Sequence, residues 1–465
     1  MHYDGAAGAA ILHFRFPIPV RAAHGNLVSL LFYRLLSILA LAAYAPYALL
    51  RSLTGRRKIG GLRGRMGLSP YPELSGGIWV HAVSVGEVGV ARSLLSELAR
   101  KAPGRPLGLS VSTAAGIELM RRRPVAGAAS FAFPLDLAGP VDRALSKVDP
   151  GLVLLTETEI WPLFLQRASA RGIPVALVNG RLSERSFARY RLAGRWFARV
   201  LGRLSLYAMQ TEEDAARIRK LGAPEDRVFV TGNVKYDLPT PTPFSDAARL
   251  AAAAAGRPVL VAASTGEGEE DLIVTAWESL PDEIRPFLAV APRRPERFDA
   301  VAALLRGRGF SVIRRSDPAS GAAPVTRSPD PSNTRSPIYL LDSIGELAAL
   351  YRLAKLAFVG GTLIPVGGHN PIEAWAAGVP VLVGPHTANF REIVAAGERL
   401  GILRTVRDPE SLAAALQAAL ADPQALSTSG ERARAAVAES RGAAARTADL
   451  VLPLLPPARR QSAAR

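Results

Sequence analysis

Hydrophobic and polar positions alternate regularly along the first half of this chain. Short apolar runs recur there, at residues 78–83, 107–112, 151–155, 175–179 and 204–210. Amphipathic stretches of helical length, such as residues 88–100 and 163–171, separate these runs. This alternation is typical of a parallel sheet whose strands are buried on both faces by helices. We therefore predict an α/β domain in this half.

The same pattern begins again in the second half of the chain. Its apolar runs lie at residues 258–264, 287–292, 338–342, 356–361 and 379–384. Between the halves, Pro239, Pro241 and Pro243 predict a semi-rigid extended linker, because each proline fixes its own φ and disfavours a helix just before it. We predict two Rossmann-like α/β domains of similar size, whose parallel sheets face each other across a cleft between strand carboxyl ends.

These patterns divide the chain into six parts. We predict an N-terminal extension (1–25), a membrane-anchor helix with a basic juxtamembrane segment (26–66), an N-terminal domain (67–238), a linker (239–246), a C-terminal domain (247–430), and a C-terminal helix and tail (431–465). A Pro/Ser-rich stretch at residues 316–336 is typical of a surface loop.

The anchor prediction comes from the apolar segment at residues 27–50. Arg34 and Pro46 interrupt it and leave 16 uncharged residues, whereas a bilayer crossing needs about 20. A basic cluster follows, which favours a cytoplasmic position at an anionic lipid surface and places the domains on the cytoplasmic side of the membrane. A cleaved signal peptide is the alternative, although the basic cluster follows the apolar run instead of preceding it.

The charge balance adds a class of partner. The chain has 57 Lys and Arg residues and 40 acidic residues, which gives a formal net charge of +17. Such a charge is typical of a protein with an anionic partner, but also of an ordinary solvated basic surface. Nucleic acid is disfavoured, because aromatic residues make up only 6% and no zinc-finger spacing occurs. The absence of cysteine excludes disulfides, thiolate metal sites and a thiol nucleophile.

Four charged residues follow predicted strands of the N-terminal domain. Glu87, in SVGEVGV, opens a helix where an ionised carboxylate could accept a proton, or could only stabilise that helix. Glu157 and Glu159, in TETEIWP, are two apart and would face the same side of an extended segment, either in one site or as a surface pair. Lys235, in GNVKYD, could neutralise a phosphate or carboxylate, or be solvated.

The C-terminal domain offers places for a phosphorylated ligand. ASTGEGEED, at residues 263–271, joins a strand to a helix through small residues whose backbone N–H groups could contact phosphate, although it lacks the Walker lysine pattern. Arg293 and Arg294 follow the next strand, where a guanidinium can pair with phosphate. Gly345 and Glu346 bring their amides to a helix start.

The most specific string is FVGGTLIPVGGHNPIEAWAAGVPVLVGP, at residues 358–385. Its paired glycines allow a ligand to approach the backbone, Asn370 can cap a helix, and Pro371 suits the first turn. Glu373 in that turn can accept hydrogen bonds from both ribose hydroxyls. Capping of the helix start would by itself also explain Asn370 and Glu373. His369 could equally be an ordinary loop residue or a residue that contacts the ligand.

Taken together, these strings resemble the 3-deoxy-D-manno-octulosonic acid (Kdo) transferases of Gram-negative lipopolysaccharide assembly. The resemblance covers about residues 27–450 and also includes NGRLSERS, QTEEDAARIRKLG, APRRPERF and DSIGELAALY. It implies a GT-B fold, CMP-Kdo as the donor held by the C-terminal domain, a lipid A precursor (lipid IVA) as the acceptor at the N-terminal domain, inversion at the anomeric carbon, and no metal or other cofactor.

The resemblance also assigns roles to individual residues. Glu87 matches the family's general base, and Glu157 and Lys235 match its transition-state stabilisers. The positions that match its CMP contacts are Pro292, Arg293, Gly345, Glu346, Leu347, Asn370, Pro371, Ile372 and Glu373. Two other interpretations remain: a sugar-nucleotide epimerase of similar fold, which would bind UDP and need no anchor, and a non-catalytic basic module that binds a membrane surface.

Overall fold

The computed structural model describes residues 62–457, apart from 84, 114–115, 119, 121–123, 126, 239–240 and 318–335. The predicted extension, the apolar segment of the predicted anchor and most of the predicted Pro/Ser-rich loop lie outside the described residues. Within the described residues, no helix combines the length and the apolar character that a bilayer crossing requires. The basic segment ends in a short helix, α2 (Leu62–Arg65).

The N-terminal domain contains a parallel sheet with strand order β3-β2-β1-β4-β5-β6-β7. Its strands are β1 (Ile78–Ala82), β2 (Leu107–Val111), β3 (Ala128–Ala132), β4 (Leu152–Thr156), β5 (Val175–Gly180), β6 (Leu206–Met209) and β7 (Val228–Val230). Every residue of β1, β2 and β4 is buried, as expected for strands covered on both faces. The α/β prediction for this half is confirmed.

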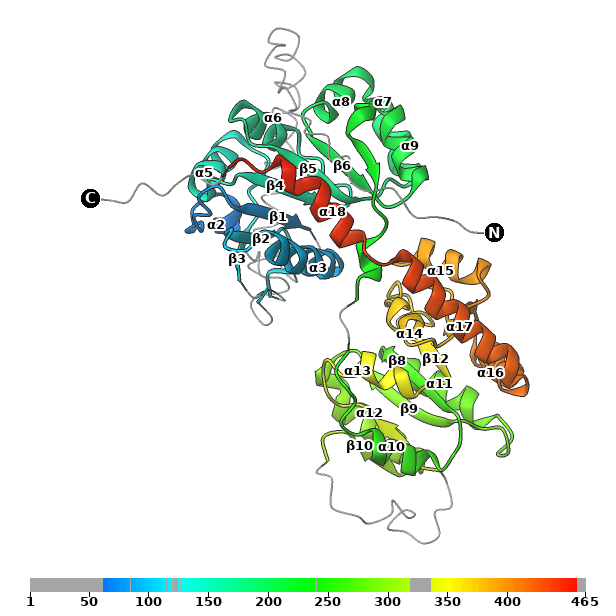
Figure 1. Ribbon diagram of the computed structural model, residues 1–465. Coiled ribbons are helices and arrows are strands. Elements are labelled where there is room, and N and C mark those ends of the chain that lie inside the picture. The colour runs from blue at the N-terminus through cyan, green and yellow to red at the C-terminus, as the bar shows by residue number, and fades with distance from the viewer. Residues whose placement is uncertain are drawn as a thin grey trace, which may run out of the picture.

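Helices cover both faces of this sheet (Figure 1). They are α3 (Val85–Lys101), α5 (Ala138–Val148), α6 (Pro162–Ala170), α7 (Glu184–Leu192), α8 (Gly194–Leu201) and α9 (Glu212–Lys220), with 3-10 turns η1 (Glu225–Arg227) and η2 (Val234–Tyr236). On one face Trp79 packs edge-on against Phe164, with ring centroids 5.4 Å apart. On the other face the apolar side of α3, including Leu94 and Leu98, is buried.

The C-terminal domain repeats this architecture with strand order β10-β11-β9-β8-β12-β13-β14, again all parallel. Its strands are β8 (Val259–Thr265), β9 (Phe287–Pro292), β10 (Val312–Arg314), β11 (Ile338–Leu340), β12 (Leu356–Val359), β13 (Val381–Val383) and β14 (Leu403–Thr405). All five strands predicted for this half are present. Two parallel-sheet α/β domains are therefore confirmed.

The helices of the second sheet include the last part of the chain. They are α10 (Ala247–Ala254), α11 (Glu269–Glu278), α12 (Phe298–Gly307), α13 (Leu347–Leu350), α14 (Ile372–Ala376), α15 (Arg391–Arg399), α16 (Pro409–Ala421) and α17 (Pro423–Ser440), with 3-10 turns η3 (Pro295–Arg297) and η4 (Tyr351–Leu353). Helix α17 packs against α14. The predicted boundary at residue 430 therefore falls inside a helix of this domain.

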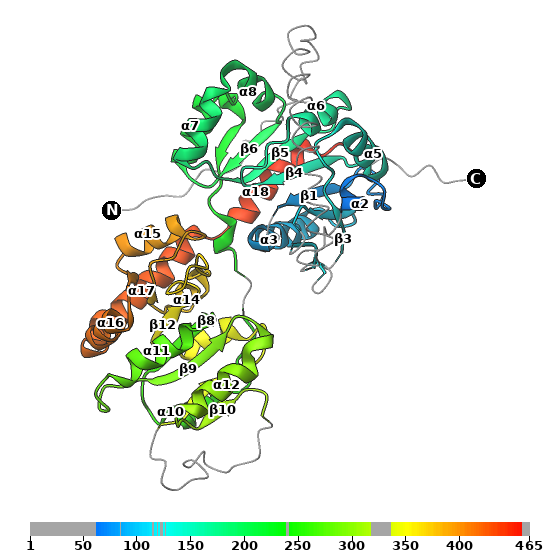
Figure 2. The ribbon, with the colours of Figure 1, turned by 180° about the vertical axis from the view of Figure 1, so that it is seen from behind.

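The chain then returns to the N-terminal domain. Helix α18 (Ala443–Val451), followed by η5 (Leu452–Leu454), packs against α3, so the two domains are connected by two chain segments (Figures 1 and 2). The carboxylate of Asp237, next to the linker, accepts hydrogen bonds from the backbone N–H groups of Gly442 at 2.5 Å and Ala444 at 2.6 Å. These bonds satisfy free amides at the start of α18 and join the two segments at one point.

The strand orders locate the crevices where ligands bind in such sheets. In the N-terminal domain β1 neighbours both β2 and β4, and in the C-terminal domain β8 neighbours both β9 and β12. From β1 and from β8 the chain first adds strands on one side of the sheet, and it later adds strands on the other side. A crevice therefore opens beyond the carboxyl ends of these central strands. The loops that follow these six strands are therefore where functional side chains should gather.

Candidate active site

Glu87 lies in the first turn of α3, directly after β1 at the crevice of the N-terminal domain. Its Oε2 accepts a hydrogen bond from the backbone N–H of Val83 at 2.9 Å and lies 2.8 Å from Oγ1 of Thr156, the last residue of β4. Only 8% of Glu87 is exposed. The carboxylate is thus fixed between the two central strands, where a positioned base could act.

Glu157 follows Thr156 and forms an ion pair with Lys235. The Lys235 Nζ lies 2.8 Å from Glu157 Oε1, although the two residues are 78 positions apart. Lys235 lies in η2 after β7, where its backbone N–H donates to the side chain of Asn233. The structure therefore brings together two residues that the sequence indicated separately. Glu157 follows β4, the strand next to the one that precedes Glu87.

The backbone at Glu157 adopts the left-handed conformation, with φ of 55°. A non-glycine residue in this region costs of the order of 1 kcal/mol and is often found at functional sites. The left-handed turn also corrects one expectation, because Glu157 and Glu159 do not lie on an extended segment. The two acids follow β4 through a turn instead.

Glu159 nevertheless belongs to the same electrostatic environment. Burial, and then the negative charges of Glu87 and Glu157, raise the pKa of Glu159 to about 7. A carboxyl in this situation binds its proton more tightly than usual, because ionisation would add a third negative charge to a partly buried region.

Two polar residues support this site although the sequence analysis did not select them. His81 in β1 is fully buried, stacks on Phe133 with ring centroids 3.7 Å apart, and burial lowers its pKa to about 3, so the ring is neutral. Asn179 at the end of β5, with φ of 51°, accepts a hydrogen bond from the backbone N–H of Val234 at 2.9 Å. That bond positions the segment that carries Lys235. An Asn-Gly pair directly after a buried run was the available signal for Asn179.

In the C-terminal domain, the GGHNPIE string forms the loop that leads into α14. Oδ1 of Asn370 accepts a hydrogen bond from the backbone N–H of Ile372, the first residue of α14, at 3.1 Å, although Pro371 and not Asn370 occupies the N-cap position. Burial raises the pKa of Glu373, and the positive charge of Arg293 partly offsets that rise. Glu373 and Arg293, from different loops, therefore act on each other electrostatically.

The other predicted nucleotide contacts lie around this pair. Pro292 is the buried last residue of β9, and Arg293 after it is exposed. Burial, and then the charges of Arg293 and Arg294, lower the pKa of His369 to about 4, so this imidazole is neutral near pH 7. The predicted residues from the β9 and β12 loops thus share one part of the sheet edge.

The segment from Gly345 to Leu347 starts α13. Gly345 has φ of 98°, a conformation that glycine adopts without strain, and Glu346 pairs with Arg315 at 3.0 Å. The helix continues into Tyr351, whose pKa is raised first by burial and then by the charge of Glu373. The residue that follows α13, Tyr351, is therefore within electrostatic reach of Glu373.

The small-residue loop after β8 differs from expectation. The side chain of Glu269, which is fully buried, accepts hydrogen bonds from the backbone N–H groups of Gly266, Gly361, Thr362 and Leu363 at 2.7 to 3.0 Å. The amide of Gly266 that was expected to be available to phosphate is already bound to a carboxylate of its own chain. This loop instead supports the start of the GGTL segment after β12.

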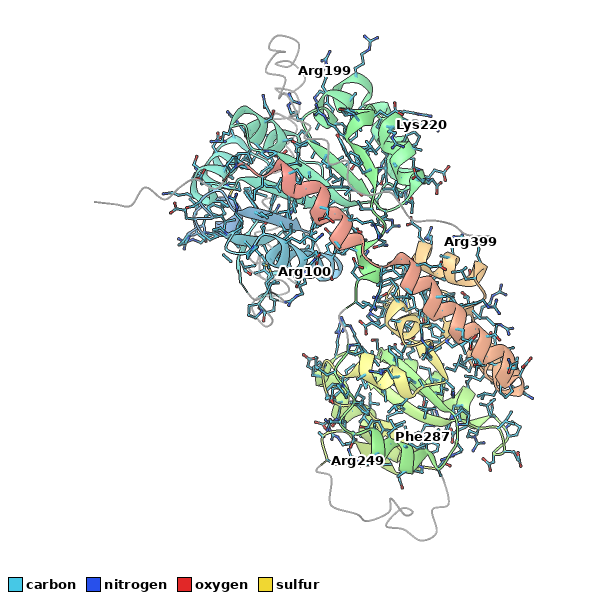
Figure 3. The ribbon with its side chains drawn as sticks, in the orientation of Figure 1. Arg100, Arg199, Lys220, Arg249, Phe287 and Arg399 are labelled. Atoms are coloured by element: carbon cyan, nitrogen blue, oxygen red, sulfur yellow. The ribbon has the colours of Figure 1, made fainter. Side chains whose placement is uncertain are left out.

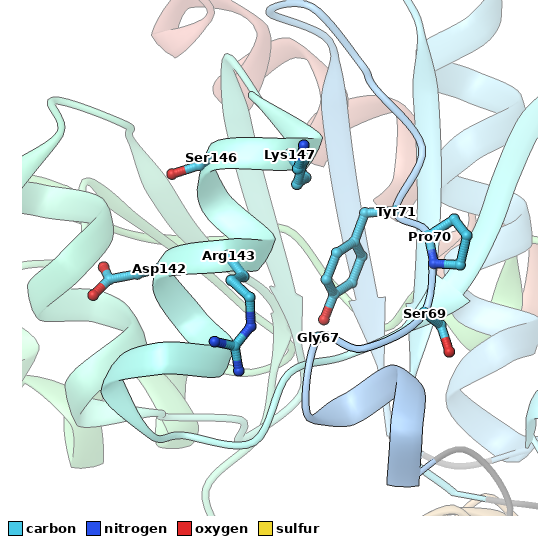
Figure 4. A pocket seen from close by; sticks show the side chains of 8 residues that line it. All are labelled: Gly67, Ser69, Pro70, Tyr71, Asp142, Arg143, Ser146 and Lys147. Carbon is cyan, nitrogen blue, oxygen red and sulfur yellow. The ribbon is translucent and has the colours of Figure 1, made fainter.

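A pocket of about 500 Å³ lies away from these residues (Figure 4). It is lined by the loop between α2 and β1 and by α5, and it contains none of the predicted site residues. Arg143 donates a hydrogen bond to the backbone oxygen of Met66 at 2.7 Å, and Tyr71 donates one to Gly64 at 2.9 Å. These contacts attach α2 to the domain.

Two parallel-sheet domains, joined by two segments and with polar residues at the strand carboxyl ends, define a protein of GT-B type. Residues 60–238 match the family model for 3-deoxy-D-manno-octulosonic-acid transferase, and residues 338–436 match that for glycosyl transferases group 1. A putative UDP-N-acetylglucosamine 2-epimerase from Listeria monocytogenes is 14% identical, covers 81% of this chain and 95% of its own, and superposes with a TM-score of 0.51. That likeness concerns the fold alone.

Curated relatives specify the family further. The 3-deoxy-D-manno-octulosonic acid transferase of Bordetella pertussis is 36% identical over 83% of this chain and 89% of its own. The enzyme of the same name from Haemophilus influenzae is 34% identical over 82% of this chain and 87% of its own. The chain belongs to the 3-deoxy-D-manno-octulosonic acid transferase family and is a glycosyltransferase.

Proposed function

We propose that the protein transfers Kdo from CMP-Kdo to a lipid A precursor, lipid IVA, with inversion at the anomeric carbon. Family membership supports the sugar and the reaction class. The single structural observation that supports the mechanism is the position of Glu87, held by Val83 and Thr156 at the crevice and beside the Glu157–Lys235 pair.

Glu87 acts as the general base in this proposal. The acceptor hydroxyl oxygen forms a bond to the anomeric carbon of Kdo while the bond from that carbon to the phosphate oxygen of CMP breaks. CMP leaves with the electron pair, and the hydroxyl proton passes to Glu87. Direct displacement from the opposite face inverts the anomeric carbon.

The Glu157–Lys235 pair stabilises the negative charge of the transition state in this proposal. Glu157 holds the Lys235 ammonium through a 2.8 Å contact, and about one fifth of each side chain is exposed. A pre-positioned cation in a partly desolvated site stabilises negative charge without having to reorganise during the reaction. The Kdo carboxylate and the leaving phosphate both carry such charge, so no metal ion is needed for this role.

CMP binds in the C-terminal domain. Glu373 accepts hydrogen bonds from the ribose hydroxyls, the exposed Arg293 guanidinium pairs with the phosphate, and the segments at 345–347 and 370–372 enclose the nucleotide. The mutual electrostatic influence of Arg293 and Glu373 supports this arrangement, because a nucleotide would bridge the same two side chains.

Residues 26–66 hold the protein at the cytoplasmic face of the inner membrane in this proposal. The apolar segment and its basic flank support it, because such a flank is attracted to anionic lipid. An anchor would raise the effective concentration of the lipid acceptor at the site rather than alter the chemistry.

The product mass tests the proposed reaction. The full-length protein in detergent is incubated with lipid IVA and CMP-Kdo, and in parallel with lipid IVA and UDP-sugars. We expect the lipid to gain the mass of whole Kdo units in the first reaction and nothing in the second. Transfer from UDP-sugars alone would contradict the proposal.

A further inference from the structure

A second pocket, of about 380 Å³, lies at the carboxyl edge of the C-terminal sheet. One wall consists of residues 365–367 from the loop after β12, and the other of residues 385–389 and 391 from the loop after β13. The nucleotide-contact residues predicted from the sequence are absent from this lining. The pocket is nonetheless close to them in sequence, because its first wall continues directly into His369 and Asn370.

Hydrogen bonds join the two walls. The backbone N–H of His386 donates to the backbone oxygen of Thr362, and that of Asn389 donates to Gly367, both at 2.9 Å. Gly367 has φ of 100°, and a Cβ there would lie 2.7 Å from Nδ2 of Asn389. A side chain at position 367 would crowd the side chain of Asn389 and strain the backbone, so the close contact between the walls favours glycine at this point.

The lining chemistry suits a polyhydroxylated anion. His386, Thr387, Asn389 and Arg391 contribute polar side chains, and none of the lining residues is acidic. Arg391 supplies a guanidinium whose planar donors match a carboxylate. Hydroxyl, amide and imidazole groups beside it are suited to hydrogen bonds with sugar hydroxyls.

A contact between the two domains lies next to this pocket. Glu392, next to Arg391 at the start of α15, forms an ion pair with Arg181, which follows β5 in the other domain, at 2.7 Å. Arg391 therefore lies beside a contact between the two domains. A group bound there would be next to the nucleotide residues on one side and next to the domain that carries Glu87 on the other.

We propose that this pocket binds the acidic sugar of the donor, with the sugar carboxylate on Arg391 and its hydroxyl groups on Thr387 and Asn389. This assignment rests on the proposed function and adds to it a specificity site for the sugar, separate from the residues that bind the nucleotide. It explains how the enzyme distinguishes CMP-Kdo from CMP.

The test compares Arg391→Gln with Arg399→Gln, a matched control at the other end of the same helix, where Arg399 is exposed (Figure 3). Three quantities are measured on the full-length protein in detergent: the KM for CMP-Kdo, the KM for lipid IVA, and the Kd of CMP. We expect Arg391→Gln to raise the KM for CMP-Kdo about ten- to hundredfold, the usual effect of losing a charge-assisted hydrogen bond.

The other quantities separate the possible sources of the effect. The Kd of CMP and the KM for lipid IVA should stay within about twofold of wild type, Arg391→Lys should recover part of the loss, and Arg399→Gln should behave as wild type. An unchanged KM for CMP-Kdo, an equal weakening of CMP, or a rise confined to lipid IVA would each overturn the proposal. Wild-type protein that binds no CMP would instead contradict the proposed function itself.

Discussion

The carboxyl group of Glu159 lies in the electrostatic field of Glu87 and Glu157, and its protonation responds to both. Its pKa of about 7 lies above the ordinary value of 4.5 because burial and these two negative charges disfavour ionisation. The Glu159 carboxyl group therefore changes its protonation state near neutral pH. This residue makes the stability of the site region pH-dependent.

The direction of that dependence follows from proton uptake on folding. Between pH 4.5 and 7 the folded chain holds the Glu159 proton and the unfolded chain does not, so stability is fully present below pH 4.5 and falls as pH rises through 7. Glutamine imitates the protonated carboxyl. Glu159→Gln should leave the free energy of unfolding nearly unchanged at pH 4.5 and raise it by about 3 kcal/mol at pH 8 relative to wild type.

Urea denaturation of both proteins at the two pH values provides the measurement. Glu184→Gln, at an exposed position of α7, serves as the control and should give the same small difference at both. A constant difference between Glu159→Gln and wild type across this range would disprove the shifted titration.

The sequence could identify residues of the site one at a time but not their pairing. Glu87, Glu157 and Lys235 were each predicted because each follows an apolar run. The contact between Glu157 and Lys235 joins positions 78 apart and depends on the left-handed turn at Glu157, which no local pattern indicates. His81 was missed because it lies inside an apolar run, where its hydrogen bond with Ser110 is made across strands.

At the scale of elements, the loop after β12 depends on one buried carboxylate. The two oxygens of Glu269 accept four backbone N–H groups, two each, and these come from both the β8 and β12 loops. The amides of Gly361 and Thr362 are buried and those of Gly266 and Leu363 are partly buried, so the carboxylate replaces hydrogen bonds to water that they lose on folding. Glu269 is therefore a positioning residue for the segment that leads to GGHNPIE.

Replacing that carboxylate with an amide should destabilise the domain. In Glu269→Gln one oxygen becomes an NH₂ group, which cannot accept the two N–H groups that it faces. Each unsatisfied buried group costs about 1–3 kcal/mol, so we expect the free energy of unfolding to fall by at least about 2 kcal/mol. Glu267→Gln, two residues earlier and exposed, should change it by less than about 0.5 kcal/mol.

Chemical denaturation of the two variants at one pH makes the comparison. If Glu269→Gln were as stable as Glu267→Gln, the four hydrogen bonds would not support the loop as described.

Strands were the elements that the sequence predicted best. The apolar runs of the C-terminal domain correspond to β8, β9, β11, β12 and β13, because central strands are apolar on both faces. The edge strand β3 was not predicted, because its sequence AASFA is short, rich in small residues and only partly buried. In the loop at 263–271, the pattern of small residues gave no sign that Glu269 would bind the amide of Gly266.

At the scale of the whole molecule, the domains are connected in a way that periodicity cannot reveal. The prolines of the linker predicted the first connection. The second, from α17 to α18, contains no proline or long polar run, and Asp237 binds the amides that start α18 across more than 200 residues. The sequence of an amphipathic helix such as α18 is compatible with either domain. Only its packing against α3 assigns α18 to the N-terminal domain.

This connection has a consequence for the mechanism. The proposed base lies in the N-terminal domain and the proposed nucleotide site in the C-terminal domain, and each is fixed by hydrogen bonds within its own domain. A change at the base should therefore affect transfer without affecting nucleotide binding.

Glu87→Gln tests this separation directly. The measurement is the single-turnover rate of transfer from CMP-Kdo to lipid IVA, together with the Kd of CMP, for wild type and variant. We predict a rate at least about a hundredfold lower, since general base catalysis contributes about 10² to 10⁴, with the Kd of CMP within about twofold of wild type. A variant that transfers at nearly the wild-type rate while binding CMP normally would contradict the assignment of Glu87 as the base.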